Sequence, residues 1–163
     1  MKKTIKTTLI SLLILIGMNV TFAQSTEMKL NQVELMKQFL GTCKGEFGNN
    51  TFFKSENEPF SNGIISNSQV TVDGKIADSI SQIYGYDSKL DKFIIAELKK
   101  SSSTIELCLI WFNSDTTGEI IITNPQNAPL SFKFEFKDSS TILQTAIKDN
   151  NVVNTVILRK IKE

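Results

Sequence analysis

The side chains that could do chemistry in this sequence do not include histidine, because its 163 residues contain none. That absence excludes Ser-His-Asp and Cys-His nucleophilic sites, and it excludes zinc or haem held by imidazole. Gly-rich phosphate-binding motifs are also missing, and two cysteines cannot supply a four-sulfur metal site. We therefore predict no cofactor, and any catalysis would have to rest on carboxylates or lysines.

Two pairs of carboxylates are the remaining candidates for acid–base chemistry. Asp87 and Asp91 flank the predicted turn "DSKLD", and Glu56 and Glu58 lie in residues 55–63, a polar, proline-containing segment that we predict as a loop. A general acid–base pair needs one carboxyl group with a raised pKa, which requires burial. We interpret both pairs as solvated surface charges, so an enzyme based on carboxylates or lysine is the third-ranked function.

Arg159 is the one arginine among 18 basic residues, and it lies in an apolar segment near the end of the chain. In a strand it would share a face with Val153, Thr155 and Ile157, which predicts that this face points inward. A lone buried charge is costly, so an inward arginine would pair with a ligand carboxylate or with a buried acid. We therefore predict Arg159 as a ligand-binding residue.

Three aromatic residues are further candidates for a ligand-binding wall. Tyr84 and Tyr86 share one face of their predicted strand, and Trp111 shares a face with Ile105, Leu107 and Leu109. Aromatic side chains often line concave binding sites, but they are equally common in ordinary cores. Both interpretations stay open, because both faces of the strand that ends near Trp111 are apolar and neither is marked as the interior.

The two cysteines, Cys43 and Cys108, permit one disulfide bond if the protein folds in an oxidising compartment. Both also lie in apolar segments, where a free cysteine behaves as a small hydrophobic residue. The sequence does not place their Cβ atoms relative to each other, so the disulfide and the two free thiols are both compatible with it.

The elements that must position these residues are mostly strands. Polar turns recur about every 8 to 14 residues, and "LSFKFEF" places Phe132, Phe134 and Phe136 on one face. The Asp73-Gly74 pair between two alternating runs predicts a tight hairpin. Because a long open sheet leaves unpaired edges, we predict an all-β fold, an antiparallel up-and-down barrel of about eight to ten strands.

A short helix is predicted before the first strand. Ser25 or Thr26 could cap it, Val33 and Met36 share a face, and Gly41 could end it. A single helix in front of a run of strands suits a lid over one end of a barrel.

The first 23 residues have the pattern of a secretory signal peptide. A basic start precedes the apolar residues 9–20, and the small residues Thr21 and Ala23 stand before Gln24. We predict cleavage between Ala23 and Gln24, one mature domain over residues 24–163, and a secreted or periplasmic location. The mature chain would hold 15 basic and 17 acidic residues, which predicts no nucleic-acid partner, and it has no apolar run long enough for a membrane span.

Three motifs give the chain a resemblance to the calycin superfamily, which includes the lipocalins, the fatty-acid-binding proteins and uncharacterised lipocalin-like bacterial proteins. "LGTCKGEF" is similar to the opening of such barrels, "YGYDSKLDKF" to a central hairpin, and "VILRKI" to a closing strand with an arginine. The resemblance implies a barrel with a small apolar or amphipathic ligand. It also implies that Arg159 either binds the ligand's carboxylate, as in fatty-acid-binding proteins, or caps one barrel end, as in lipocalins.

Cys43 departs from that pattern, because lipocalins carry a tryptophan there that packs against the last-strand arginine. A cysteine cannot form this cation–π contact, so we expect another element, such as the N-terminal helix, to fill the space. Our first interpretation is an exported barrel that binds a small amphipathic molecule through Arg159, Tyr84, Tyr86 and Trp111. The second is a structural or protein-interaction module with a filled barrel, and the sequence does not identify its partner.

Overall fold

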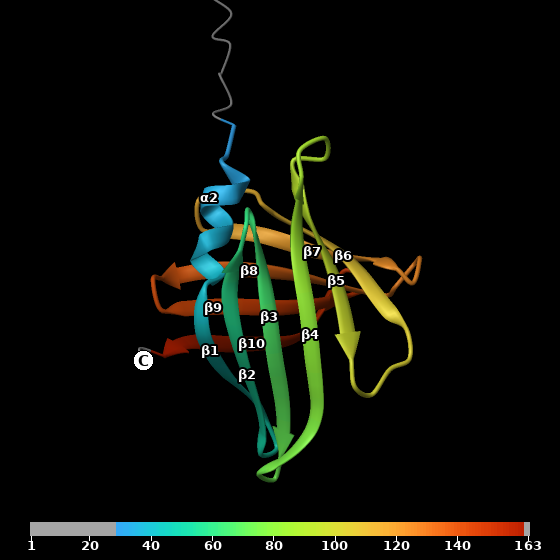
Figure 1. The fold of residues 1–163 in the computed structure, drawn as a ribbon. Helices are drawn as coiled ribbons and strands as arrows, with labels where there is room; N and C mark the ends of the chain where they lie inside the picture. Colours follow the sequence, from blue (N-terminus) through green and yellow to red (C-terminus); the bar gives the residue numbers. More distant parts are fainter. Residues whose placement is uncertain (1–28, 162–163) are drawn as a thin grey trace, which may run out of the picture.

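The computed structural model describes residues 29–161, and ten antiparallel strands within them close into one barrel. Each strand pairs with its neighbours in sequence, and β1 pairs with β10 to close the sheet, so the predicted up-and-down barrel is confirmed. In Figure 1, β8, β9 and β10 cross behind β2, β3 and β4 at a large angle. The strands are β1 Gly41–Gly48, β2 Thr51–Phe60, β3 Gly63–Val72, β4 Lys75–Asp87, β5 Lys92–Lys99, β6 Ile105–Phe112, β7 Thr117–Asn124, β8 Leu130–Asp138, β9 Thr141–Lys148 and β10 Asn151–Ile161.

The predicted signal peptide, residues 1–23 with its cleavage point between Ala23 and Gln24, lies outside the described residues. Ser25 and Thr26, the predicted helix caps, lie outside them as well. Within residues 29–161, no helix combines the length and hydrophobicity needed to cross a lipid bilayer.

Two-residue turns with left-handed backbone connect several of the hairpins. Asp73 and Gly74 have φ values of 50° and 76°, which is the conformation of a type I′ turn, so the predicted hairpin is confirmed. The same conformation recurs at Asn49-Asn50 and at Asp149-Asn150. Asparagine, aspartate and glycine tolerate positive φ best, so these short polar turns fix the register of the strands they join.

The loop predicted over residues 55–63 is wrong, because β2 continues through this segment to Phe60. Pro59 lies inside the strand and pairs with Ile64 of β3. A proline cannot donate a backbone hydrogen bond, but the pairing of β2 with β1 reaches only as far as Asn57. Pro59 is therefore tolerated where the strand has one neighbour, and the true turn is the pair of residues that follows Phe60.

The short helix α2, Gln32–Met36, continues as the 3-10 turn η1, Lys37–Phe39, and covers one end of the barrel. Its N-cap is Asn31, whose side chain accepts a hydrogen bond from the Glu34 amide at 3.2 Å. Gln32 holds the helix to the barrel: its side chain donates to the Phe112 carbonyl at 3.0 Å and accepts from the Phe112 amide at 2.8 Å.

Aromatic rings fill the barrel beneath this helix. Phe39 packs edge-on against Phe134 at 5.1 Å and against Phe136 at 5.0 Å between ring centroids, and Phe112 contacts all three rings. Met36 lies in the same cluster, only 2% exposed. We call these five residues the closed end. Two of them, Met36 and Phe39, come from α2 and η1, so the helical segment takes part in filling this end of the barrel.

Candidate ligand-binding cavity

A cavity of about 400 Å³ lies inside the barrel next to the closed end, and Phe39 contributes to its wall. This volume falls within the range of about 300 to 1,000 Å³ that small-molecule sites occupy. The barrel interior is thus filled at one end and hollow beside it. Residues from all ten strands line this cavity. On each strand only every second side chain points inward, so the alternation of the strand determines which residues reach the cavity.

One wall of the cavity is polar because the strand register aligns polar residues across five neighbouring strands. Asn57 of β2 pairs with Ser66 of β3, Ser66 with Gln82 of β4, Gln82 with Glu97 of β5, and Glu97 with Glu106 of β6. All five line the cavity. We call this line of residues the polar row. The adjacent row repeats the pattern, with Ser55, Ser68 and Lys99 also facing inward.

The opposite wall is largely apolar and comes from the last four strands. It includes Ile120 and Ile122 of β7, Phe132 of β8, Ile142 of β9 and Leu158 of β10. The two sides of the cavity therefore differ: β2 to β6 carry the polar row together with apolar residues such as Ile80, Ile95 and Ile110, and β7 to β10 are apolar except for Gln144. A molecule with one polar end and one apolar body would match both sides.

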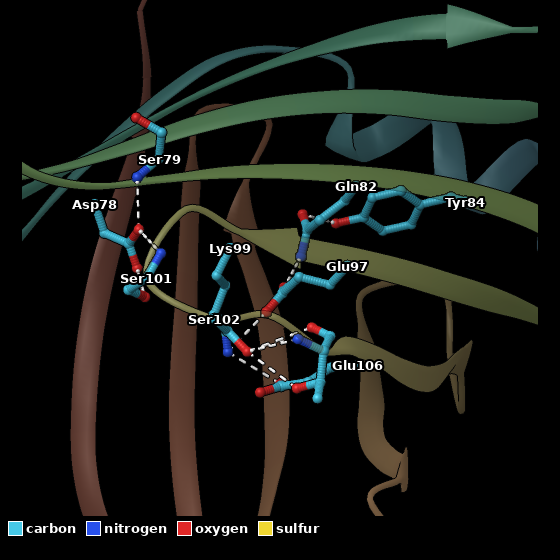
Figure 2. A network of polar contacts seen from close by, with 10 residues as sticks. Asp78, Ser79, Gln82, Tyr84, Glu97, Lys99, Ser101, Ser102 and Glu106 are labelled. Atoms are coloured by element: carbon cyan, nitrogen blue, oxygen red, sulfur yellow. Dashed lines mark hydrogen bonds and ion pairs between the residues drawn. The ribbon is translucent and has the colours of Figure 1, made fainter.

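The polar wall contains a connected network of charges and hydrogen bonds (Figure 2). The Lys99 ammonium lies 2.9 Å from one oxygen of Glu97 and 3.0 Å from one oxygen of Glu106. Gln82 donates to the second oxygen of Glu97, and the Tyr84 hydroxyl donates to the Gln82 side-chain oxygen at 2.9 Å. Two carboxylates and one ammonium thus share the same side of the cavity.

Burial and these charges shift the protonation of nearby groups. Burial works to lower the pKa of Lys99, but the hydrogen bonds and charges of Glu97 and Glu106 outweigh it, so the pKa is raised overall. Burial, with the charge of Glu97 second, raises the pKa of Tyr84. Burial, with help from Glu97 and then Glu106, raises the pKa of the Cys108 thiol to about 11. Lys99 is therefore an ammonium, and Tyr84 and Cys108 are neutral, near pH 7.

Two serines point into the cavity without using their hydroxyl groups. Ser66 is 1% exposed and Ser68 is 4% exposed, and both line the cavity. Within residues 29–161, neither hydroxyl has a hydrogen-bond partner. Among the described residues, no side-chain nitrogen or oxygen that is sealed from solvent lacks a partner, so these two hydroxyls face the open space of the cavity, where a ligand or a water molecule can bond them.

The turn between β5 and β6 is fastened next to this network. The Ser101 amide and hydroxyl both donate to the Asp78 carboxylate of β4, at 3.1 and 2.5 Å (Figure 2). The Ser101 hydroxyl is the main reason that the pKa of Asp78 is lowered. These bonds hold the turn that follows Lys99 against β4, so the ends of the strands that carry Glu97 and Glu106 are fixed relative to each other.

Of the predicted ligand-binding residues, only Tyr84 lies in the cavity wall. Tyr86 also packs against the core, with its ring 5.3 Å from that of Phe93, but it does not line the cavity. Its hydroxyl donates to Asp91 at 2.5 Å, and Asp91 in turn lies 3.4 Å from the Lys29 ammonium. Tyr86 therefore helps to hold the start of the described chain.

The predicted inward orientation of Arg159 is wrong. Val156 and Leu158 are the buried residues of β10, at 6% and 8% exposure, whereas Ile157 is 47% exposed and Arg159 lies with it on the outer face. Arg159 contributes to an open outer groove across β10, β1, β2 and β3. Apolar residues occupy both faces of β10, so their presence beside Arg159 did not mark the interior.

Trp111 also lies on the outer face, because Ile110 and Phe112 are the buried residues at this end of β6. Its indole donates to Asn113 at 2.7 Å, and the Lys92 ammonium lies 3.5 Å from the ring centroid. This exposed cation–π contact is a surface feature and has no access to the cavity.

Cys43 and Cys108 are free and buried, and both line the cavity. They lie on β1 and β6, which are five strands apart in either direction around the closed sheet. A disulfide requires two Cα atoms within about 7 Å, which residues on opposite walls do not reach. Of the two alternatives left by the sequence, the structure has the free thiols.

The two carboxylate pairs singled out in the sequence lie outside the cavity. Glu56 and Glu58 are exposed on β2, and Asp87 accepts backbone hydrogen bonds within the turn that follows β4. Asp91 has a lowered pKa, chiefly because of the Tyr86 hydrogen bond. Among the described residues, no group of three or more Cys, Asp or Glu side chains is arranged to hold a metal ion.

The acidic pair inside the barrel, Glu97 and Glu106, was missed in the sequence, although a signal for it existed. Phe93 and Ile95 are almost fully buried on β5, and the same alternation continued two and four residues further reaches Glu97 and Lys99. A charged residue on the same face of a strand as buried residues is expected to point inward. This alternation therefore indicates that Glu97 and Lys99 lie inside the barrel.

No protein-family model and no curated protein matches the sequence. The closed ten-stranded antiparallel barrel with a preceding short helix is consistent with a calycin-like fold.

Proposed function

We propose that this protein is an exported, calycin-like barrel that binds a small amphipathic molecule in its interior cavity. The observation that carries this proposal is the uneven lining of the 400 Å³ cavity, with the polar row on one side and mostly apolar residues of β7 to β10 on the other. Burial of apolar ligand surface contributes roughly 25 cal/mol per Å², and a few polar groups fix the ligand's orientation. The unpartnered hydroxyls of Ser66 and Ser68 are available for that second task.

A second candidate is a protein-interaction module that uses the outside of the barrel. The open groove of about 790 Å³ favours it, because Lys44, Lys54 and Arg159 stand there beside the exposed apolar residues Phe52 and Ile157. This candidate ranks second because it leaves the hollow and partly polar interior without a role.

A carboxylate-based enzyme ranks third. Glu97 and Glu106 do supply two acids inside the barrel, which such an enzyme would need. Lys99, however, bonds one oxygen of each, and Gln82 bonds the second oxygen of Glu97, so within residues 29–161 only the second oxygen of Glu106 is left for such chemistry.

The test of binding is native mass spectrometry of the protein purified from the medium or periplasm, with solvent extraction of whatever is bound. We expect a recurring small amphiphile, and a protein that begins at Gln24 if the chain is exported and cleaved as proposed. A protein without any bound molecule, and without a thermal shift across a panel of lipids and metabolites, would contradict the binding function.

A pair of alanine-to-phenylalanine variants, one inside the cavity and one on the outer face, tests where the ligand binds. Ala146 lines the cavity, whereas Ala96 of β5 alternates with cavity residues and faces outward. We expect Ala146→Phe to abolish the bound mass by filling the cavity, and Ala96→Phe to preserve it. Arg159→Ala should also preserve it, and loss of binding in that variant would move the site to the outer groove.

A further inference from the structure

We propose that the polar end of the ligand is a cation, an ammonium group held by Glu106 at the β6 end of the polar row. This inference rests on the proposed binding function and assigns the chemical class of the ligand: a small amphipathic amine. It is opposite in sign to the carboxylate ligand that an inward Arg159 would have implied.

The wall of the cavity carries a net negative charge. Among the described residues that line the cavity, Glu97 and Glu106 carry carboxylates, and Lys99 carries the one ammonium. The Glu97 and Glu106 side chains are only 13% and 25% exposed, so water screens them incompletely. A net charge of −1 in a partly desolvated space is costly, and a bound cation would balance it.

The carboxylates of the cavity wall also offer a hydrogen-bond acceptor that is not used. Both oxygens of Glu97 are occupied, by Lys99 and by Gln82, but Glu106 uses one oxygen for Lys99 and leaves the other without a partner in residues 29–161. The hydroxyls of Ser66 and Ser68 lie on β3, three strands from Glu106, and are too far away to bond the same ammonium group. An ammonium group carries three donors and no acceptor, so it fits this unused oxygen.

Two neutral groups on the same wall, Tyr84 and Cys108, are affected by the charges of the acids. The charge of Glu97 contributes, after burial, to the raised pKa of Tyr84, and the charges of Glu97 and Glu106 contribute in the same way at Cys108. The negative potential of the two acids therefore extends along β4 and β6. A carboxylate ligand would be repelled there, and the single ammonium that could receive it is already shared between two acids.

The test compares three probes that share one tail, octylamine, octanol and octanoate, by isothermal titration calorimetry at pH 7 with the mature protein. A cation site predicts that octylamine binds at least about tenfold more tightly than octanol, with octanoate weakest, because a charge-assisted hydrogen bond is worth about that factor. Ala146→Phe should weaken all three probes, which locates them in the cavity.

Two variants change the charge of the cavity in opposite directions. Glu106→Gln should weaken octylamine about tenfold and leave octanol within twofold, while Lys99→Gln should strengthen octylamine. Glu119→Gln is the control: Glu119 pairs with Trp111 on the outer face of β7 and should change nothing. Circular dichroism and a thermal unfolding curve confirm that each variant is folded.

The outcomes separate the two proposals. If none of the probes binds up to millimolar concentration, the binding function fails, and the inference fails with it. If octanol or octanoate binds in the cavity as tightly as octylamine, or if Glu106→Gln leaves octylamine unaffected, the binding function stands and the cation site is overturned.

Discussion

The closed end and the polar row occupy the same barrel interior but are built on different principles. At the closed end, Phe112, Phe134 and Phe136 are 2 to 6% exposed and pack ring against ring under the helix. In the polar row and beside it, the side chains of Glu97, Lys99 and Glu106 remain 13 to 29% exposed. One region is fully desolvated and filled, and the other is partly hydrated and hollow.

The difference indicates that stability and recognition are located in separate parts of this barrel. Full burial of one phenylalanine side chain contributes about 1.5 to 3 kcal/mol, whereas ion pairs with access to water contribute about 0 to 1 kcal/mol. The free energy of unfolding should therefore depend mainly on the closed end, and ligand affinity mainly on the polar wall. Substitutions in the two regions, and one at Tyr86 outside both, test that division.

The largest loss of stability is expected for Phe134→Ala. Phe134 is 3% exposed and contacts three other rings, so its truncation leaves a cavity and should lower the free energy of unfolding by about 3 to 5 kcal/mol. Urea unfolding measures this. Phe60→Ala is the control, since Phe60 is 60% exposed, and it should cost less than about 1 kcal/mol. Equal losses in both variants would contradict the assignment of stability to the closed end.

A smaller loss is expected for Glu97→Gln in the polar row. The substitution removes one charge from the Lys99 pair but keeps the shape, and Lys99 retains Glu106, so we expect about 1 to 2 kcal/mol in urea unfolding. The control is Glu135→Gln, which breaks the exposed pair with Lys137 and should cost about 0.5 kcal/mol or less. A loss as large as that of Phe134→Ala would show that the polar network, too, determines stability.

A pH-dependent loss is expected for Tyr86→Phe, which removes the hydrogen bond that chiefly lowers the pKa of Asp91. Because the folded state lowers this pKa, Asp91 stabilises the protein above its unfolded pKa of about 3.9, and the contribution disappears as the pH falls through the lower folded value. The variant should therefore be less stable than the parent protein at pH 6, and the difference should shrink as the pH falls from about 3.9 towards 2.5. A gap of constant size between these pH values would argue against the Asp91 contact.

The smallest effect is expected for Ser66→Ala. The Ser66 hydroxyl has no partner within residues 29–161, so its removal should change the free energy of unfolding by less than about 0.5 kcal/mol. Ser101→Ala removes a hydroxyl that donates to Asp78 and should be the more destabilising of the two. A loss above about 1.5 kcal/mol for Ser66→Ala would mean that the hydroxyl contributes to folding and is not reserved for a ligand.

The fold was predictable from the sequence because local signals determine it. Positive-φ turns such as Asp73-Gly74 and the alternation of Phe132, Phe134 and Phe136 specify hairpins and their inner faces without any long-range information. The loop predicted around Pro59 failed for a non-local reason, since only the short reach of β1 allows a proline there.

The candidate site was predictable only in part, because the outer face of this barrel is also rich in apolar residues. Ile157 and Leu98, at 47% and 54% exposure, make outward faces resemble inward ones, which is why Arg159 was assigned to the wrong side. The polar row depends on the register of five strands at once, and a single strand such as "FIIAELK" shows only that one carboxylate continues a buried face. Tyr84 was found because it is aromatic, and its neighbour Gln82 was overlooked because it is not.

The closure of the barrel by β1 and β10 has a consequence for the order of events in the life of the molecule. Thr42 pairs with Ile161, so the seam joins the first strand made to the last. The strands of the polar wall are synthesised before those of the apolar wall, and the space between them is not enclosed until β10 has been made and has paired with β1. A ligand can therefore be enclosed only after that pairing has formed.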